Sequence, residues 1–137
     1  MMKRIFYIIP SLLLALSSCG TQKSAYSIGG EWALTNLNGQ SITPTSETPF
    51  IGIDLSEGRI YGFTGCNRLT GTIDVKKFAA GKPDFSNMGM TRMLCPDDAY
   101  ERPFMQALDK VKSSEVTESE IRLKDASGKV ILTFKKK

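Results

Sequence analysis

The sequence predicts a mainly β domain with one helix, of the α+β class, built from about eight short antiparallel strands. From Glu31 onward, short apolar stretches alternate with turn residues at a spacing of about ten, which is typical of a β-sandwich or a β-barrel. The exception is residues 96–113. Tyr100, Phe104 and Leu108 recur there at the spacing of one helix face. The 137 residues are enough for one domain and too few for two.

The expected strands are short, and several of them alternate apolar and polar side chains as a half-buried strand does. Near the end of the chain, Ile121 and Leu123 share one face of a strand. The turn at residues 125–128 then leads into a second alternating stretch, which predicts a hairpin. The expected strands are residues 31–37, 50–55, 59–65, 69–75, 120–124 and 129–134, with residues 82–90 as a further, ambiguous strand.

One helix is expected within residues 96–113. Asp97 and Asp98 suit its start, because a short acidic side chain caps free backbone N–H groups and its charge favours the positive end of the helix dipole. A proline inside a helix costs about 3 kcal/mol. We therefore expect a short turn first and the main helix to begin near Pro103. Lys110 and Lys112 suit its end.

The start of the chain has the pattern of a bacterial signal peptide, in which two positive charges precede a short apolar run. Residues 5–16 would span about 18 Å as a helix, well short of a ~30 Å hydrocarbon core, so a transmembrane helix is not expected. Residues 16–19, Leu-Ser-Ser-Cys, resemble the lipobox of bacterial lipoproteins, whose cysteine becomes the first mature residue and carries lipid. We therefore expect residues 1–18 to be removed and Cys19 to anchor the protein in a membrane.

The residues after Cys19 indicate in which membrane the protein is anchored. Gly20 follows directly, with no acidic cluster after it, and by resemblance to lipoprotein sorting rules this favours the periplasmic face of the outer membrane. Residues 19–29 are mostly small and polar, which predicts a flexible tether, and the domain is expected to span residues 30–137. An ordinary signal peptide followed by an incidental cysteine is the alternative.

Charge and composition exclude several function classes. The chain has 18 basic and 14 acidic residues, a net charge of +4, and losing Lys3 and Arg4 with the signal peptide would leave +2. That charge is too small to indicate nucleic acid as a partner. The sequence has no histidine, the commonest general base and metal ligand at neutral pH. We expect no enzyme, cofactor or metal site, since the available carboxylates all suit turns and caps: Asp54, Asp97, Asp98 and Glu101.

Three segments, taken in order, carry a family resemblance. The first is a Trp-Ala-Leu strand at residues 32–34 followed by an Asn-Gly turn, and the second is the glycine-rich stretch at residues 62–71. The third is Met-Thr-Arg-Met-Leu-Cys at residues 90–95, followed by Glu101 and residues 104–108, and the hairpin at residues 123–128 closes the set. Together they resemble the META domain family, which includes heat-shock lipoproteins of the HslJ type. The motif residues are Trp32, Gly65, Cys66, Asn67, Gly71, Thr91, Met93 and Cys95.

The resemblance implies a compact, barrel-like antiparallel β fold in the bacterial cell envelope, often on a lipoprotein, with links to heat shock and antibiotic tolerance. It brings no enzymatic reaction. We expect a non-enzymatic envelope lipoprotein that supports stress or antibiotic tolerance by binding an unidentified envelope protein or ligand. Because the fold also resembles a secretin pilot lipoprotein, the alternative is a chaperone-like or pilot module that holds an apolar peptide or acyl chain. Four methionines help to distinguish these two functions, because methionines form an adaptable apolar binding surface if they are exposed and fill the core if they are buried. They are Met88, Met90, Met93 and Met105.

Two features of the motif have alternative interpretations. Gly62, Gly65 and Gly71 in a strand region predict bulges or close backbone approach, with a ligand-facing loop as the alternative. Cys66 and Cys95 would be the two cysteines left after lipidation of Cys19, and an even pair in an oxidising compartment predicts a disulfide. The main alternative is two reduced, buried thiols. A redox or metal role is disfavoured, because the sequence has no Cys-x-x-Cys and too few further ligands.

Overall fold

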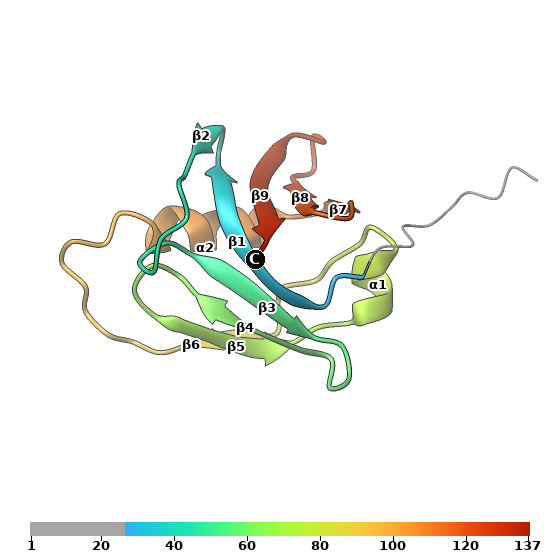
Figure 1. Cartoon of the computed structure of the whole chain (residues 1–137), viewed down its shortest axis with the longest axis horizontal. Coiled ribbons are helices and arrows are strands. Elements are labelled where there is room, and N and C mark those ends of the chain that lie inside the picture. Colours follow the sequence, from blue (N-terminus) through green and yellow to red (C-terminus); the bar gives the residue numbers. More distant parts are fainter. Residues whose placement is uncertain (1–26) are drawn as a thin grey trace, which may run out of the picture.

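Eight antiparallel strands form one curled sheet in the computed structural model, which describes residues 27–137 (Figure 1). Their order is β6-β5-β4-β3-β1-β9-β8-β7, and a ninth, two-residue strand pairs with β1. In chain order the strands are β1 (Gly30–Leu37), β2 (Gln40–Ser41), β3 (Phe50–Asp54), β4 (Arg59–Phe63), β5 (Arg68–Thr72), β6 (Met88–Met90), β7 (Ser113–Val116), β8 (Glu120–Lys124) and β9 (Val130–Lys136).

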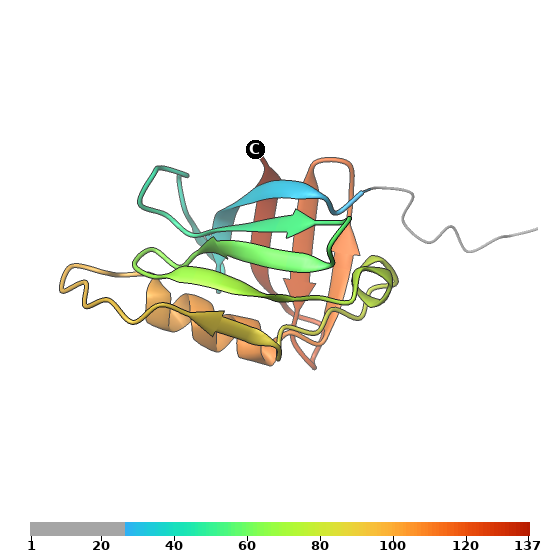
Figure 2. The ribbon, with the colours of Figure 1, turned by 90° about the horizontal axis from the view of Figure 1, so that it is seen from below.

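The sheet curls into a half-barrel where its two halves meet. Strands β1 and β9 join the halves, and their register shifts between Leu34 and Asn36. A bulge of this kind adds local twist to a strand pair. Figure 2 shows the result: the strands from β3 to β6 run across those from β9 to β7. This arrangement confirms the expected antiparallel, barrel-like β fold.

Helix α2 (Glu101–Lys110) covers the open side of the curl (Figure 2). Asp98 supplies the expected cap, since its Oδ1 accepts from the backbone N–H groups of Tyr100 at 2.8 Å and Glu101 at 3.1 Å. Asp97 is exposed. The helix begins two residues earlier than expected. Pro103 fits because it lies in the first turn, where a backbone N–H has no partner within the helix.

The prediction for residues 69–75 was wrong at its end. Strand β5 stops at Thr72, and a second helix, α1 (Val75–Ala79), follows. Asp74 starts this helix, because its Oδ1 accepts from the Lys77 backbone N–H at 3.0 Å. The fold therefore has two short helices where the sequence predicted one, and neither helix in residues 27–137 is long and apolar enough to cross a membrane. Strand β7 was also not predicted, and only residues 88–90 of the ambiguous stretch form a strand.

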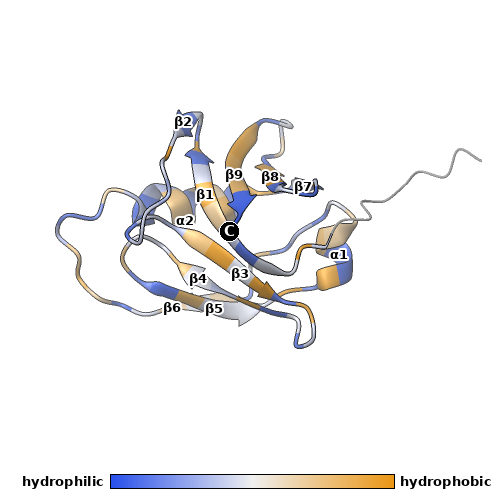
Figure 3. Ribbon diagram, in the orientation of Figure 1, coloured by the Kyte–Doolittle hydropathy of each residue, from blue (hydrophilic) through white to orange (hydrophobic). Residues whose placement is uncertain are grey.

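The core lies between the inner face of the sheet and α2. Phe104 of α2 meets Phe134 of β9 edge to face, with ring centroids 6.2 Å apart. Trp32 is fully buried, and its indole N–H donates to the Ile28 carbonyl at 3.0 Å. Figure 3 shows apolar residues concentrated on β3 and β9. The largest fully buried side chains are Trp32, Phe78, Phe104 and Phe134.

Candidate functional site

Six of the eight motif residues meet at one end of the fold. Gly65, Cys66 and Asn67 form the turn between β4 and β5, and the other three lie on the segment that follows β6. These two segments face the start of α2. We call them the brace, defined as residues 64–67 and 91–95 together with Glu101. Trp32 and Gly71 lie outside it, the former in the core and the latter in β5.

Asn67 is the centre of the brace. Its side chain is buried, and its Oδ1 accepts from the Thr91 hydroxyl at 2.9 Å and from the Met93 backbone N–H at 2.6 Å. Its Nδ2 donates to the Met93 carbonyl at 3.2 Å and to Glu101 Oε1 at 2.7 Å. One side chain therefore holds the loop after β6 to the β4–β5 turn and to α2.

Thr64 and Glu101 complete this network. The Thr64 hydroxyl donates to Glu101 Oε1 at 2.7 Å and accepts from the backbone N–H groups of Cys66 at 3.1 Å and Asn67 at 2.8 Å. Thr64 was not singled out from the sequence, whereas Glu101 was expected as a turn or cap carboxylate and belongs to the third segment of the family resemblance. The spacing of Thr64 and Asn67 is typical of a hydroxyl-capped turn and was the available signal for Thr64. Glu101 is half-buried, and its Oε1 accepts both of these hydrogen bonds, from Thr64 and from Asn67.

A disulfide closes the brace. Cys66 and Cys95 are bonded as expected, with their Cα atoms 5.8 Å apart. Asn67 fixes the backbone of Met93, and the disulfide fixes Cys95 two residues later. The loop is therefore held on both sides of Leu94.

The segment held in this way is apolar and exposed. Leu94 is 98% exposed and Met93 55% exposed, and Met90 is exposed beside them. Met88 and Met105 are instead half-buried and pack against the core. The methionines thus divide between core filler and surface, and the exposed ones lie on or next to the brace.

The META domain family model matches residues 25–137. The chain belongs to the META domain family. The expected family is therefore confirmed, and the motif residues that the resemblance used are mainly those of the brace. No protein with a curated description matches the chain.

Three solved structures share the fold of this META domain. One is an NMR structure with 22% identity and a TM-score of 0.61, covering 80% of this chain and 90% of the other. A second NMR structure, of a protein from Burkholderia xenovorans, has 24% identity and a TM-score of 0.60, covering 79% and 81%. A crystal structure of a DUF4847 family protein from Bacteroides vulgatus ATCC 8482 has 16% identity and a TM-score of 0.55, covering 80% and 93%. At these identities the likeness concerns the fold alone.

The glycines of this META domain permit close backbone approach. A Cβ on Gly71 would lie 2.4 Å from the Asn87 carbonyl oxygen of the adjoining chain segment, so a larger residue would push β5 and β6 apart. Gly65 has a φ of +101°, which a residue with a side chain rarely adopts. The register of β5 with its neighbours is unbroken. Close approach is therefore the correct interpretation for Gly71, and a bulge is not.

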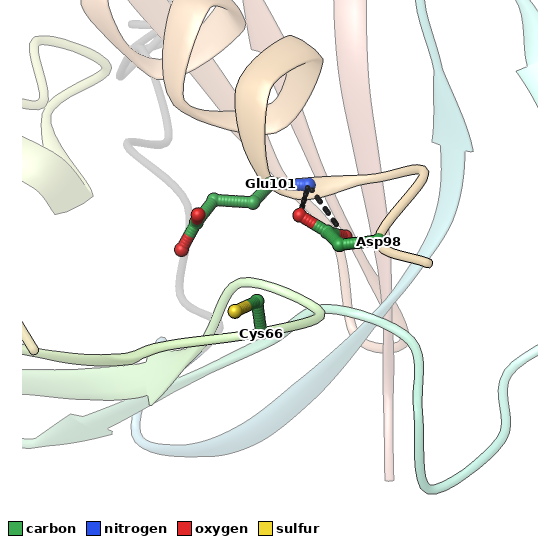
Figure 4. Close-up of side chains that lie close together, drawn as sticks. All are labelled: Cys66, Asp98 and Glu101. Carbon is green, nitrogen blue, oxygen red and sulfur yellow. Dashed lines mark hydrogen bonds between the residues drawn. The ribbon is translucent and has the colours of Figure 1, made fainter. Parts of the chain in front are cut away.

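Three potential metal ligands lie near the disulfide in this META domain. Cys66, Asp98 and Glu101 present one ligand atom each within 4.8 Å of one another (Figure 4). The Cys66 sulfur is bonded to Cys95 and offers no thiolate in this form. Asp98 is also engaged with the start of α2, and Glu101 with Thr64 and Asn67. The arrangement is better suited to holding the backbone than to binding a metal.

The carboxyl groups with shifted pKa values lie outside the brace, and one of them, Glu115 of β7, has its pKa lowered by its hydrogen bond to Lys124. The Ser56 hydroxyl bonded to Asp54 lowers the pKa of that carboxyl, and Ser127 does the same for Asp125. Each stabilises the turn of a hairpin, Asp54 between β3 and β4 and Asp125 between β8 and β9. The shifts of Asp54 and Asp125 therefore reflect turn structure.

Proposed function

We propose that this META domain protein is a non-enzymatic lipoprotein of the cell envelope that supports stress or antibiotic tolerance by binding a partner protein. It is tethered through lipid on Cys19, at the periplasmic face of the outer membrane. The observation that carries the binding role is the brace, in which Asn67 bonds to Glu101 and Met93 while Met93 and Leu94 are presented to solvent. The signal-peptide pattern and lipobox, which lie outside the described residues, support the anchor.

The chemistry of the brace favours binding over catalysis. A catalytic carboxylate or thiol needs access to a substrate and a tuned pKa. One carboxylate oxygen of Glu101 accepts hydrogen bonds from Thr64 and Asn67, and both cysteines of the brace are bonded in the disulfide. Within residues 27–137, every buried side-chain nitrogen and oxygen has a hydrogen-bond partner. Such a fully satisfied polar network stabilises one geometry.

The geometry gives less support to the alternative, a chaperone-like or pilot module. That function needs an open apolar cleft for a peptide or an acyl chain. The inside of the curled sheet is filled by large side chains, including Trp32 and Phe104. A hollow of about 490 Å³ between β2 and the start of α2 is lined by Leu37, Ile42 and Tyr100, but also by polar side chains.

A deletion strain tests the proposal. We expect it to be more sensitive to heat and to hydrophobic antibiotics, and the wild-type gene to restore tolerance. A Cys19→Ala variant should be made but fail to restore it, because the protein would no longer be tethered. Intact-mass measurement of the native protein should give a chain that starts at a lipid-bearing Cys19. Unchanged sensitivity of the deletion strain, or a full-length chain that retains Met1, would contradict the proposal.

A further inference from the structure

We propose that Met93 and Leu94 form a docking tip that inserts into an apolar pocket with an acidic border on a folded partner protein. This inference rests on the proposed function and names the surface and the kind of partner. It goes beyond the family assignment, which identifies no binding surface.

The first support is exposure concentrated in one place. Four large apolar side chains in residues 27–137 are exposed, and three of them, Met90, Met93 and Leu94, lie within five residues of one another. Leu94 has almost its whole surface in water, although its burial would be favourable. Exposed apolar residues that gather in one place mark a site of protein–protein interaction.

The second support is that the tip is held in place. Asn67 binds both the N–H and the carbonyl of Met93, at 2.6 and 3.2 Å, and the disulfide holds Cys95. Ordering a loop upon binding weakens affinity, and a loop already ordered by the fold avoids that loss. The brace thus gives the exposed leucine the fixed geometry that specific docking requires.

The third support concerns orientation, and it favours a protein partner over the anchoring bilayer. The loop that carries the tip lies at one end of the long axis in Figures 1 and 2, and the described chain begins at the other end. A lipid on Cys19 would attach the domain by the end opposite the tip. The tip therefore lies at the end of the domain opposite this attachment point, where it is free to meet a partner protein.

The fourth support is charge. Arg92 and Arg68 are exposed beside the tip. The two segments that carry them are hydrogen-bonded to each other. The Arg68 backbone N–H donates to the Thr91 hydroxyl at 3.0 Å, and the Thr91 backbone N–H donates to the Arg68 carbonyl at 3.1 Å. Neither arginine takes part in an ion pair within the described part of the chain. Acidic groups on the border of the partner's pocket that faces Arg68 and Arg92 would complement them, whereas the exposed Asp97, three residues after Leu94, favours no acidic group on its own side.

Site-specific photocrosslinking in the native envelope tests the proposal. A photoreactive residue replaces Leu94 in the full-length lipoprotein, and Leu55 is the matched control. Leu55 is also exposed, at 46%, but it lies against Gly29 where the described chain begins. We expect one discrete protein adduct from position 94 and none of that mass from position 55.

The adduct protein is then purified and its binding to the whole lipoprotein measured. Leu94→Ala should weaken binding by about thirtyfold, as for an anchor residue, whereas Leu55→Ala should change it less than about twofold. Arg92→Glu should slow association and reduce its dependence on salt. Thermal unfolding should be unchanged in Leu94→Ala, since the side chain has almost no contacts to lose.

Several outcomes would contradict the proposal that Met93 and Leu94 form a docking tip. They are adducts with lipid, with a second copy of this chain or with nothing, and equal affinity of wild type and Leu94→Ala for the captured protein. Should the deletion strain still be stress-sensitive in those cases, the proposed function stands and only the tip fails. Unchanged tolerance of the deletion strain together with a Leu94-dependent complex would instead refute the stress role and leave the docking surface intact.

Discussion

Replacing Asn67 with alanine should destabilise the domain by about 3 kcal/mol. The side chain makes four hydrogen bonds of 3.2 Å or less, to Thr91, to both backbone groups of Met93 and to Glu101. A bond to an ionised carboxylate contributes about 1.5–3 kcal/mol, and a neutral bond about 1 kcal/mol. Water can reach the exposed Thr91 and Met93 and replace part of the loss there, which brings the sum to about 3 kcal/mol.

Urea unfolding followed by fluorescence measures this loss, because the single tryptophan, Trp32, is fully buried in the core. The disulfide is kept intact throughout. At roughly 4 °C per kcal/mol for a domain of this size, the midpoint of thermal unfolding should fall by about 12 °C. Asn87→Ala is the matched control, since Asn87 is exposed and its side chain donates one hydrogen bond, to the Thr72 hydroxyl, and it should cost about 1 kcal/mol or less. A loss below about 1 kcal/mol for Asn67→Ala, or one no larger than the control's, would refute the central role of this side chain.

Three further predictions concern the disulfide, a motif glycine and a hairpin turn. Reduction of the disulfide should lower the free energy of unfolding by about 3.5 kcal/mol, the value expected for a closed loop of about 30 residues. The Cys95→Ser variant should show the same loss without reductant. Equal urea midpoints with and without reductant would contradict this prediction. Gly71→Ala should cost more than about 2 kcal/mol in urea unfolding because its Cβ would meet the Asn87 carbonyl, whereas Gly89→Ala, where a Cβ meets nothing within 4 Å, should be close to neutral. A Gly71→Ala protein as stable as Gly89→Ala would show that the strands separate at no cost. The pKa of Asp125 is lowered chiefly by the Ser127 hydroxyl, so its ionised form stabilises the fold. The difference in free energy of unfolding between wild type and Asp125→Ala should therefore be constant above about pH 5 and should shrink as the pH falls through the lowered pKa of Asp125. A difference that grows in acid would contradict the prediction.

The parts of the fold predicted from sequence are those with strong local patterns. The final hairpin combined alternating apolar residues with a turn, and it forms β8 and β9. Helix α1 was missed because Ile73 and Val75 continue the alternation of β5, and a five-residue helix has too little periodicity to show. Strand β7 was missed because its Ser-Ser-Glu-Val sequence has no apolar alternation, as suits a short strand at the edge of a sheet.

The candidate site divides in the same way. Cys66, Asn67 and Cys95 stood out through the family resemblance. The network that joins them did not, because Thr64 and Glu101 are 37 positions apart and only the fold brings them together. The exposure of Leu94 could not be predicted from the sequence either, since a leucine between Met93 and Cys95 suggests a buried stretch.

Amide hydrogen exchange at Met93 and Leu94 tests most directly whether the brace holds an exposed apolar tip in place. The Met93 N–H donates to Asn67 Oδ1 at 2.6 Å, whereas the Leu94 N–H has no hydrogen bond among the described residues. We predict that the Met93 amide exchanges at least about tenfold more slowly than its neighbour in the oxidised wild-type protein, and equally fast in Asn67→Ala. Equal exchange of the two amides in the wild type would mean that the loop moves freely and that the brace does not hold the tip.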